Sequence, residues 1–281
     1  MTPTVTCAVL LAALAHASWN ALAHHLKDQL LSFTLISGGG ALIGLLALPF
    51  VPVPAAGAWP YLLVSAALHV GYMLLLMRSF TLGDFGQTYP IARGTAPLVV
   101  TVLAAVFVHE TPNAWQAAGV AVACAGLVGV ALWGIRGSRP NWPAIVAALA
   151  TGLTIAGYTV VDGVGVRASG SSVGYIAWLM LLEGLAVPAY ALYRRGPRLA
   201  GELRPFAARG LLGAALSVAA YGLVLWAQTR APLAPVAALR ESSIIVGAAI
   251  GAVFFKERFG APRIAAAGLL VVGIGLMLRA G

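Results

Sequence analysis

The sequence is poor in charge. Of its 281 residues, 9% are Asp, Glu, Lys or Arg, whereas 60% are hydrophobic. A water-soluble domain of this length needs far more charged surface, so the composition excludes that class of protein. Apolar runs of about 20 residues recur along the chain, and each is long enough to cross a bilayer as a helix. We therefore expect an integral membrane protein with many spans.

Cysteines and metal-binding motifs are scarce as well. The two cysteines, Cys7 and Cys124, both lie within apolar runs, which indicates packing rather than a disulfide. The sequence contains no HExxH motif, no cluster of thiolates and no ATP-binding motif, so we expect neither a metal site nor a cofactor. Basic residues outnumber acidic residues by 17 to 8, but most of them flank apolar runs. This pattern reports membrane topology and predicts no nucleic-acid partner.

The apolar runs between charges, prolines and glycines predict ten membrane-spanning helices. We expect these helices at residues 4–25, 30–51, 59–80, 86–108, 113–134, 142–165, 172–193, 206–228, 232–255 and 261–279. The connections between them are short, and the longest is the basic stretch at 194–205. Because no soluble domain remains, any function must lie within the bilayer.

The two halves of the chain resemble each other. One constant shift aligns identical residues in the fourth and ninth expected spans and just after them: Arg93 with Arg240, Val106 with Val253, Phe107 with Phe254, and Glu110 with Glu257. We therefore expect two repeats of five helices, at residues 1–135 and 142–281. Because five is odd, the second repeat must enter the membrane in the opposite sense. Inverted repeats of this kind are typical of secondary transporters, whose sites lie between the two halves.

Four stretches resemble a known family: ARGTAPLVVTVLAAVFVHE, LRESSIIVGAAIGAVFFKE, AHASWNAL and IAGYTVVDG. They are similar to parts of the two EamA domains of the drug/metabolite transporter superfamily, and the resemblance extends over nearly the whole chain. It implies an all-α membrane protein of ten transmembrane helices, arranged as two inverted five-helix EamA repeats around a central cavity. Spans 1, 3, 4, 6, 8 and 9 are then expected to surround the cavity, with spans 2 and 7 at its sides. Members of this family commonly export amino acids and other small metabolites.

Basic residues are divided unevenly between the two sides of the expected bundle. Twelve Lys and Arg residues lie at the connections that follow odd-numbered spans, and three lie on the other side. The positive-inside rule then places both termini outside the cytoplasm, whereas the family resemblance favours termini inside. We expect a multi-pass protein of the plasma (inner) membrane, with the orientation that the charge count gives.

Polar and aromatic side chains within the spans are the candidate substrate-binding residues, because lipid would leave their polar atoms unsatisfied. The candidates are His16, Trp19, Asn20, His69, Tyr72, Tyr89, Arg93, Tyr158, Tyr221, Arg240 and Glu241. Two arginines in one cavity would attract a small polar, zwitterionic or anionic metabolite. Structural alternatives stay open: helix–helix hydrogen bonds for the uncharged groups, and capping of carbonyls freed by nearby prolines for the arginines.

Two further acids lie within spans. Glu183 is near the middle of its span, and the equivalent position in the first repeat is about Gly44. A residue that the fold alone requires would tend to occur in both repeats, and burial lets a carboxyl group exchange protons near neutral pH. We therefore predict that Glu183 couples transport to protons, the alternative being an ion pair with Arg93 or Arg240. Asp162 is near the end of its span, where we expect it to reach interfacial water.

The sequence thus favours a secondary transporter that moves a small polar metabolite, such as an amino acid, by alternating access. Export is the expected direction, and both proton coupling and facilitated exchange stay open as the drive. The alternative is an integral-membrane enzyme acting on a lipid-linked substrate, but no paired acidic motif, nucleophile elbow or metal constellation supports one. We therefore expect no enzymatic activity. The sequence names no substrate, and it leaves both a monomer and a homodimer open.

Overall fold

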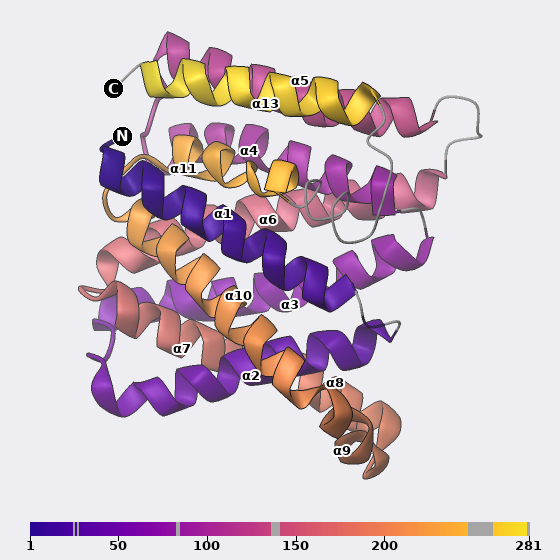
Figure 1. Ribbon diagram of the computed structural model, residues 1–281. Helices are drawn as coiled ribbons and strands as arrows, with labels where there is room; N and C mark the ends of the chain where they lie inside the picture. The colour runs from indigo at the N-terminus through magenta and orange to yellow at the C-terminus, as the bar shows by residue number, and fades with distance from the viewer. Residues whose placement is uncertain (25, 27, 83–84, 136–140, 247–260, 280–281) are drawn as a thin grey trace.

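The computed structural model describes residues 1–281 apart from 25, 27, 83–84, 136–140, 247–260 and 280–281 (Figure 1). The first half of the chain forms α1 (Pro3–His24), α2 (Gln29–Ala47), α3 (Trp59–Leu82), α4 (Phe85–Phe107) and α5 (Ala114–Ile135). The second half forms α6 (Trp142–Ala168), α7 (Ser172–Gly184), α8 (Ala186–Arg195), α9 (Arg198–Leu203), α10 (Ala207–Gln228), α11 (Leu233–Arg240) and α13 (Ala261–Arg279). Short 3-10 helices lie at Leu48–Phe50, Ala56–Ala58 and Arg204–Phe206. The described residues form no strand, so the predicted all-α fold is confirmed.

Six helical stretches are long and apolar enough to cross a membrane, which makes the chain a multi-pass membrane protein. They are Pro3–Ala23, Gln29–Phe50, Ala56–Ser79, Trp142–Ala168, Ser172–Arg195 and Arg198–Gln228. Two shorter apolar helices, Ile91–Phe107 and Ala114–Gly126, occupy the expected fourth and fifth spans. The total of ten spans stays a prediction, because parts of the other expected spans lie outside the described residues.

The seventh expected span is not one continuous helix. It divides at Leu185, where α7 has ended and α8 has not yet begun. Pro188 explains the break, because proline has no backbone N–H and its ring clashes with the carbonyl four residues earlier, here that of Gly184. Glu183 therefore lies in the last turn of α7, beside an interruption in the helix.

The ninth expected span is also interrupted. Helix α11 ends at Arg240, and the next two residues form a turn in which the amides of Glu241 and Ser242 bond to carbonyls three residues back. Its counterpart α4 continues past Arg93 without a break. Residues 243–246 are helical again, and the rest of this expected span, 247–255, lies outside the described residues, as does Glu257. Within the described part, the two repeats thus differ at the position of the shared arginine.

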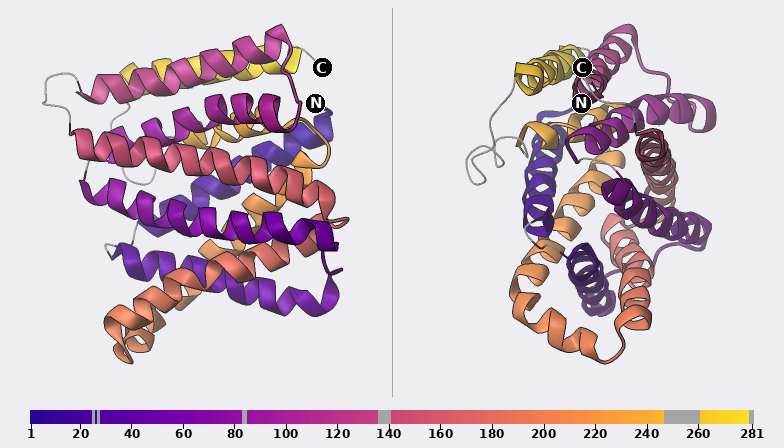
Figure 2. Two further views of the ribbon diagram at one scale, coloured as in Figure 1. Left: turned by 180° about the vertical axis from the view of Figure 1, so that it is seen from behind. Right: turned by 90° about the vertical axis from the view of Figure 1, so that its right-hand side faces the viewer.

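Helices of the two halves pair in a reciprocal way. Helix α1 packs on α10 and α3 packs on α6, so the first helix of each half meets the third helix of the other. Helix α2 packs on α7, and α5 packs on α13 along one edge of the bundle, with α8 and α9 at the opposite edge (Figure 2). If the two halves are exchanged, the pair α1–α10 becomes the pair α6–α3, and the pairs α2–α7 and α5–α13 become themselves. The inverted sense of the second repeat stays a prediction.

Partly exposed ion pairs connect the two halves at both ends of the bundle. The two termini lie at one end, and α9 lies at the other (Figure 1). Near the termini, Arg167 at the end of α6 binds Glu110, with 2.6 Å between Nη1 and Oε1. Near α9, Arg195 binds Asp28, the residue that caps the start of α2. Both pairs join a connection of the first half to a helix of the second.

Candidate functional site

A cavity lies between the two halves. Its volume is about 60 Å³, which holds a few water molecules, and its walls come from α1, α3, α6, α7, α10 and α11. Eight of the predicted residues line it: His16, Trp19, His69, Tyr72, Tyr158, Glu183, Tyr221 and Arg240. The fold therefore gathers most of the candidates at one place, although they are scattered over the sequence.

Arg93 and Glu241 do not line this cavity but bind each other. Arg93 Nε donates to Glu241 Oε2 at 2.8 Å, and Arg93 Nη2 donates to the Ser243 hydroxyl at 3.3 Å. The two side chains of the pair are only 4% and 2% exposed. Each charge thus has an opposite charge in contact, as buried ions require. The pair ties α4 of the first half to the turn that follows α11 in the second.

Arg240, the repeat counterpart of Arg93, is differently placed. It is buried and lines the cavity, and no acidic side chain of the described residues lies within 4 Å of its guanidinium nitrogens. Its Nε has no hydrogen-bond partner there, although the side chain does bind Tyr158. The residue after Arg240 is Glu241, whereas the residue after Arg93 is Gly94. These two positions therefore provide one acid for two arginines. That acid contacts Arg93, so the guanidinium of Arg240 remains available to the cavity.

Glu183 meets His69 across the cavity. Glu183 Oε2 lies 3.2 Å from His69 Nδ1, and the described residues place no arginine beside it. The His69 ring stacks on Tyr158 with 3.9 Å between ring centroids, and its edge meets Tyr221 at 5.4 Å. Tyr72 packs edge-on against Tyr158. An acid, an imidazole and three phenol rings thus form one wall of the cavity.

The remaining candidates divide between the cavity and their own helix. Trp19 Nε1 donates to His16 Nδ1 at 3.3 Å, and both side chains face the cavity. The Asn20 amide instead donates to the His16 carbonyl at 2.8 Å, so it is satisfied within α1 and does not reach the cavity. The side chain of Tyr89 lies outside the part of the chain whose side chains the structure describes.

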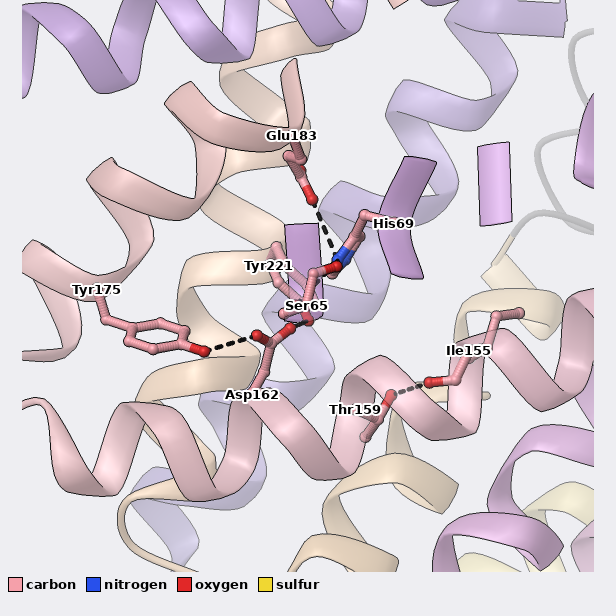
Figure 3. Close-up of polar contacts among 8 residues, drawn as sticks. All are labelled: Ser65, His69, Ile155, Thr159, Asp162, Tyr175, Glu183 and Tyr221. Carbon is pink, nitrogen blue, oxygen red and sulfur yellow. Dashed lines mark hydrogen bonds and ion pairs between the residues drawn. The ribbon is translucent and has the colours of Figure 1, made fainter. Parts of the chain in front are cut away.

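Asp162 is far from interfacial water, contrary to expectation. The residue is fully buried, and its carboxylate accepts hydrogen bonds from the hydroxyls of Tyr175, at 2.9 Å, and Tyr221 (Figure 3). The Ser65 hydroxyl also bonds to it. The expectation was wrong because α6 continues to Ala168, beyond the end of the apolar run, which leaves Asp162 deeper in the bundle.

Comparison with known proteins identifies the family. The model of the EamA-like transporter family matches residues 4–132 and, a second time, residues 142–279. The chain belongs to the EamA-like transporter family. No curated protein matches the sequence. Among similar solved structures, one described only as "Crystal structure of protein" has a TM-score of 0.75 and 18% identity, covering 98% of this chain and 99% of its own. At that identity the likeness shows the fold alone.

As an EamA protein, the chain is a membrane transporter of the drug/metabolite type. The EamA resemblance implied that span 4 lines the cavity and that span 7 lies at its side. In the structure, α7 reaches the cavity through Met180 and Glu183, and no described residue of α4 lines it. The third expected span contributes more than the sequence suggested, because Ser65 joins His69 in the polar contacts.

Three polar residues of this EamA site were not among the candidates. Asp162 could have been a candidate, because an acid inside an apolar run is rare. It was left out because we expected it to lie near the membrane surface. Ser65 and Tyr175 carried none, because a serine and a tyrosine near the start of a span are ordinary in membrane helices. Only the packing of α3 and α7 on α6 brings them to the carboxylate.

Proposed function

We propose that the protein is a secondary transporter that exports a small carboxylate-bearing metabolite by alternating access and holds the carboxylate against Arg240. One observation carries this proposal: Arg240 is buried at the cavity wall, and its Nε has no partner among the described residues. A guanidinium away from water is expensive unless an anion or water satisfies it. Its planar fork matches a carboxylate with two parallel hydrogen bonds. Arg93 cannot take this role, because Glu241 already binds it.

The opposite wall favours a metabolite that also carries a positive charge. Glu183 provides a carboxyl group, and the faces of Tyr158 and Tyr221 attract ammonium groups. An amino acid has both charges on one small molecule, so it is the substrate class that we propose. Glu183 would then bind either the ammonium group or a proton, which provides a means of coupling transport to the proton gradient.

Ligand-dependent thermal stabilisation tests the substrate class. The purified protein is heated in the presence of a panel of amino acids, amino acid amides and simple amines, because a ligand that binds only the folded state raises Tm. We expect amino acids to raise Tm and the amides, which lack the carboxylate, to be ineffective. Equal stabilisation by amides and amino acids would contradict the role of Arg240.

Variants then test the residue. Arg240→Gln should weaken binding of the stabilising amino acid by about 10- to 100-fold, the loss expected for a hydrogen bond between charged groups. Arg230→Gln is the matched control, because Arg230 is exposed and stacks on Trp226 outside the cavity. Uptake of the same radiolabelled amino acid into proteoliposomes tests transport. An Arg240→Gln protein that binds and transports as the wild type does would refute the proposal.

A further inference from the structure

Four polar side chains lie close together between the cavity wall and α6. Glu183 Oε2 lies 3.2 Å from His69 Nδ1, and His69 Nδ1 lies 3.2 Å from the Ser65 hydroxyl (Figure 3). His69 Nδ1 also lies 3.0 Å from the Ser65 carbonyl, and Glu183 Oε2 has no hydrogen-bond partner among the described residues. Ser65 in turn bonds to Asp162. The four residues come from α3, α6 and α7, so the cluster joins the two halves of the molecule.

Asp162 is surrounded by hydroxyl groups. The described residues place no basic nitrogen within 4 Å of its carboxylate, and its partners among them are the hydroxyls of Ser65, Tyr175 and Tyr221. Hydroxyl groups rotate, so they can donate to a carboxylate and accept from a carboxylic acid. The pocket around Asp162 therefore suits both protonation states. A cation in contact would have favoured the ionised state alone.

The titratable and charged groups that face Asp162 come from four neighbouring helices. They are His69 of α3, Tyr175 and Glu183 of α7, Tyr221 of α10, and Arg240 of α11, which acts at longer range. Arg93 of α4, the other helix packed on α6, is held by Glu241. A proton on Asp162 thus changes the charge next to the residues that we assign to substrate binding.

We infer that Asp162 is a second proton-binding site of the transporter, beside Glu183. This inference rests on the proposed role of Glu183 and extends it to a second carboxyl group. When Asp162 binds a proton, one carboxylate oxygen becomes an O–H group, and the hydroxyl that donates to that oxygen turns to accept from it. When the proton leaves, the hydroxyl donates to the carboxylate again.

The two acids lie at different depths in the bundle. Asp162 lies six residues before the end of α6, about 9 Å along the helix axis, at the end where the termini lie (Figure 1). Glu183 lies at the far end of α7, eleven residues after the helix begins at Ser172, which is about 17 Å. Protons on Asp162 are therefore nearer to the face with the termini, and protons on Glu183 are nearer to the middle of the bundle.

Infrared difference spectroscopy tests the inference without any substrate. The full chain is reconstituted in phosphatidylethanolamine–phosphatidylglycerol bilayers, and spectra are recorded across a pH step in H₂O and D₂O. Protonated carboxyl groups give C=O stretching bands that shift in D₂O. We expect two such bands from buried acids: Asp162→Asn should remove one, and Glu183→Gln the other. Retention of both bands in Asp162→Asn would overturn the inference.

A second variant keeps the test independent of the folding of Asp162→Asn. Tyr175→Phe covers the case in which Asp162→Asn does not fold, because it keeps the carboxyl group and removes one donor.

Tyr175→Phe should move only the Asp162 band, and an unchanged spectrum would count against protonation at Asp162. Tyr193→Phe, at an exposed tyrosine, is its control and should change neither band. Since no substrate is present, a failure of these spectra is distinguishable from a failure of amino acid transport. Spectra as expected without transport would refute the proposed function alone.

Discussion

Arg93 and Glu241 form a buried ion pair between the two EamA repeats, with 2.8 Å between Nε and Oε2. The pair separates two arginines that the sequence presents as equivalent. Arg93 is bound by Glu241, the residue that follows Arg240 in the sequence. Arg240 itself faces the cavity. The repeat thus supplies a structural arginine in the first half and a candidate binding arginine in the second.

Breaking this ion pair should destabilise the fold. Arg93→Met or Glu241→Gln leaves one buried charge without its partner, which costs about 3–5 kcal/mol for buried pairs. We expect a clearly lowered midpoint of unfolding in detergent, whereas Arg78→Gln, at an exposed arginine, should shift the unfolding free energy by less than about 0.5 kcal/mol. The double variant Arg93→Met/Glu241→Met should recover part of the loss. A double variant less stable than the sum of the single changes would contradict the pairing.

The close approach of α5 and α13 gives a second prediction. An added Cβ on Gly119 or Gly273 would come 2.6 Å from the carbonyl oxygen of the other glycine. Gly273→Ala should therefore push the helices apart and lower stability by about 1–3 kcal/mol, as overpacking does. Gly275→Ala on the same helix has no atom within 4 Å of its new Cβ, so its unfolding midpoint should stay close to that of the wild type.

A third prediction concerns the access of Tyr175 to Asp162. A Cβ on Gly165 would collide with the Tyr175 hydroxyl, so Gly165→Ala should remove the hydrogen bond to Asp162 although it changes no polar residue. We expect a loss of about 1–3 kcal/mol in stability and a displaced Asp162 carboxyl band in the infrared spectrum. Gly157→Ala, whose new Cβ makes an ordinary contact with Leu68, is the control on the same helix. An unmoved band would mean that Tyr175 does not determine the state of Asp162.

The Arg167 contacts predict local rather than global effects. Its guanidinium binds Glu110 and also the carbonyls of Gln228 and Ala231, and Glu110 in turn accepts from the amide of Leu233. Arg167→Gln should release the connection between α10 and α11. We expect hydrogen exchange at residues 228–233 to accelerate at least about tenfold, while exchange in α5 and α13 stays unchanged. Uniform acceleration across all helices would point to global unfolding instead.

A pH effect is expected at the other end of the bundle. Burial alone would raise the pKa of Asp28, but hydrogen bonds from Arg195 and from the amide of Leu31 outweigh it and hold that pKa below 3.8. A lowered pKa in the folded state means that the unfolded chain binds more protons, so this contribution to stability is present above about pH 3.8 and is lost as the pH falls further. The unfolding midpoint of Asp28→Asn should therefore fall less than that of the wild type between pH 5 and pH 3. Parallel curves would contradict this account.

Hydropathy was sufficient to predict the helical membrane fold, and four stretches that resemble EamA domains were sufficient to predict the family. The break at Leu185 was predictable as well, because Pro188 lies inside the expected helix and removes a hydrogen bond there. The pairing of Arg93 with Glu241 was not, because it depends on how α4 packs on the turn after α11, 148 positions along the chain. The depth of Asp162 was misjudged because we took the end of the apolar run, at residue 165, as the end of the helix. In the structure α6 continues beyond that run to Ala168.

The small volume of the cavity has a consequence for measured affinities. About 60 Å³ accommodates a few waters but no amino acid, so a binding-competent state needs the helices to separate. An apparent Kd then equals the intrinsic Kd divided by the fraction of molecules that are open. A substitution that holds the two repeats apart would tighten binding without adding a single contact to the substrate. Weak apparent affinity in this transporter would therefore report a rare open state as much as a poor fit.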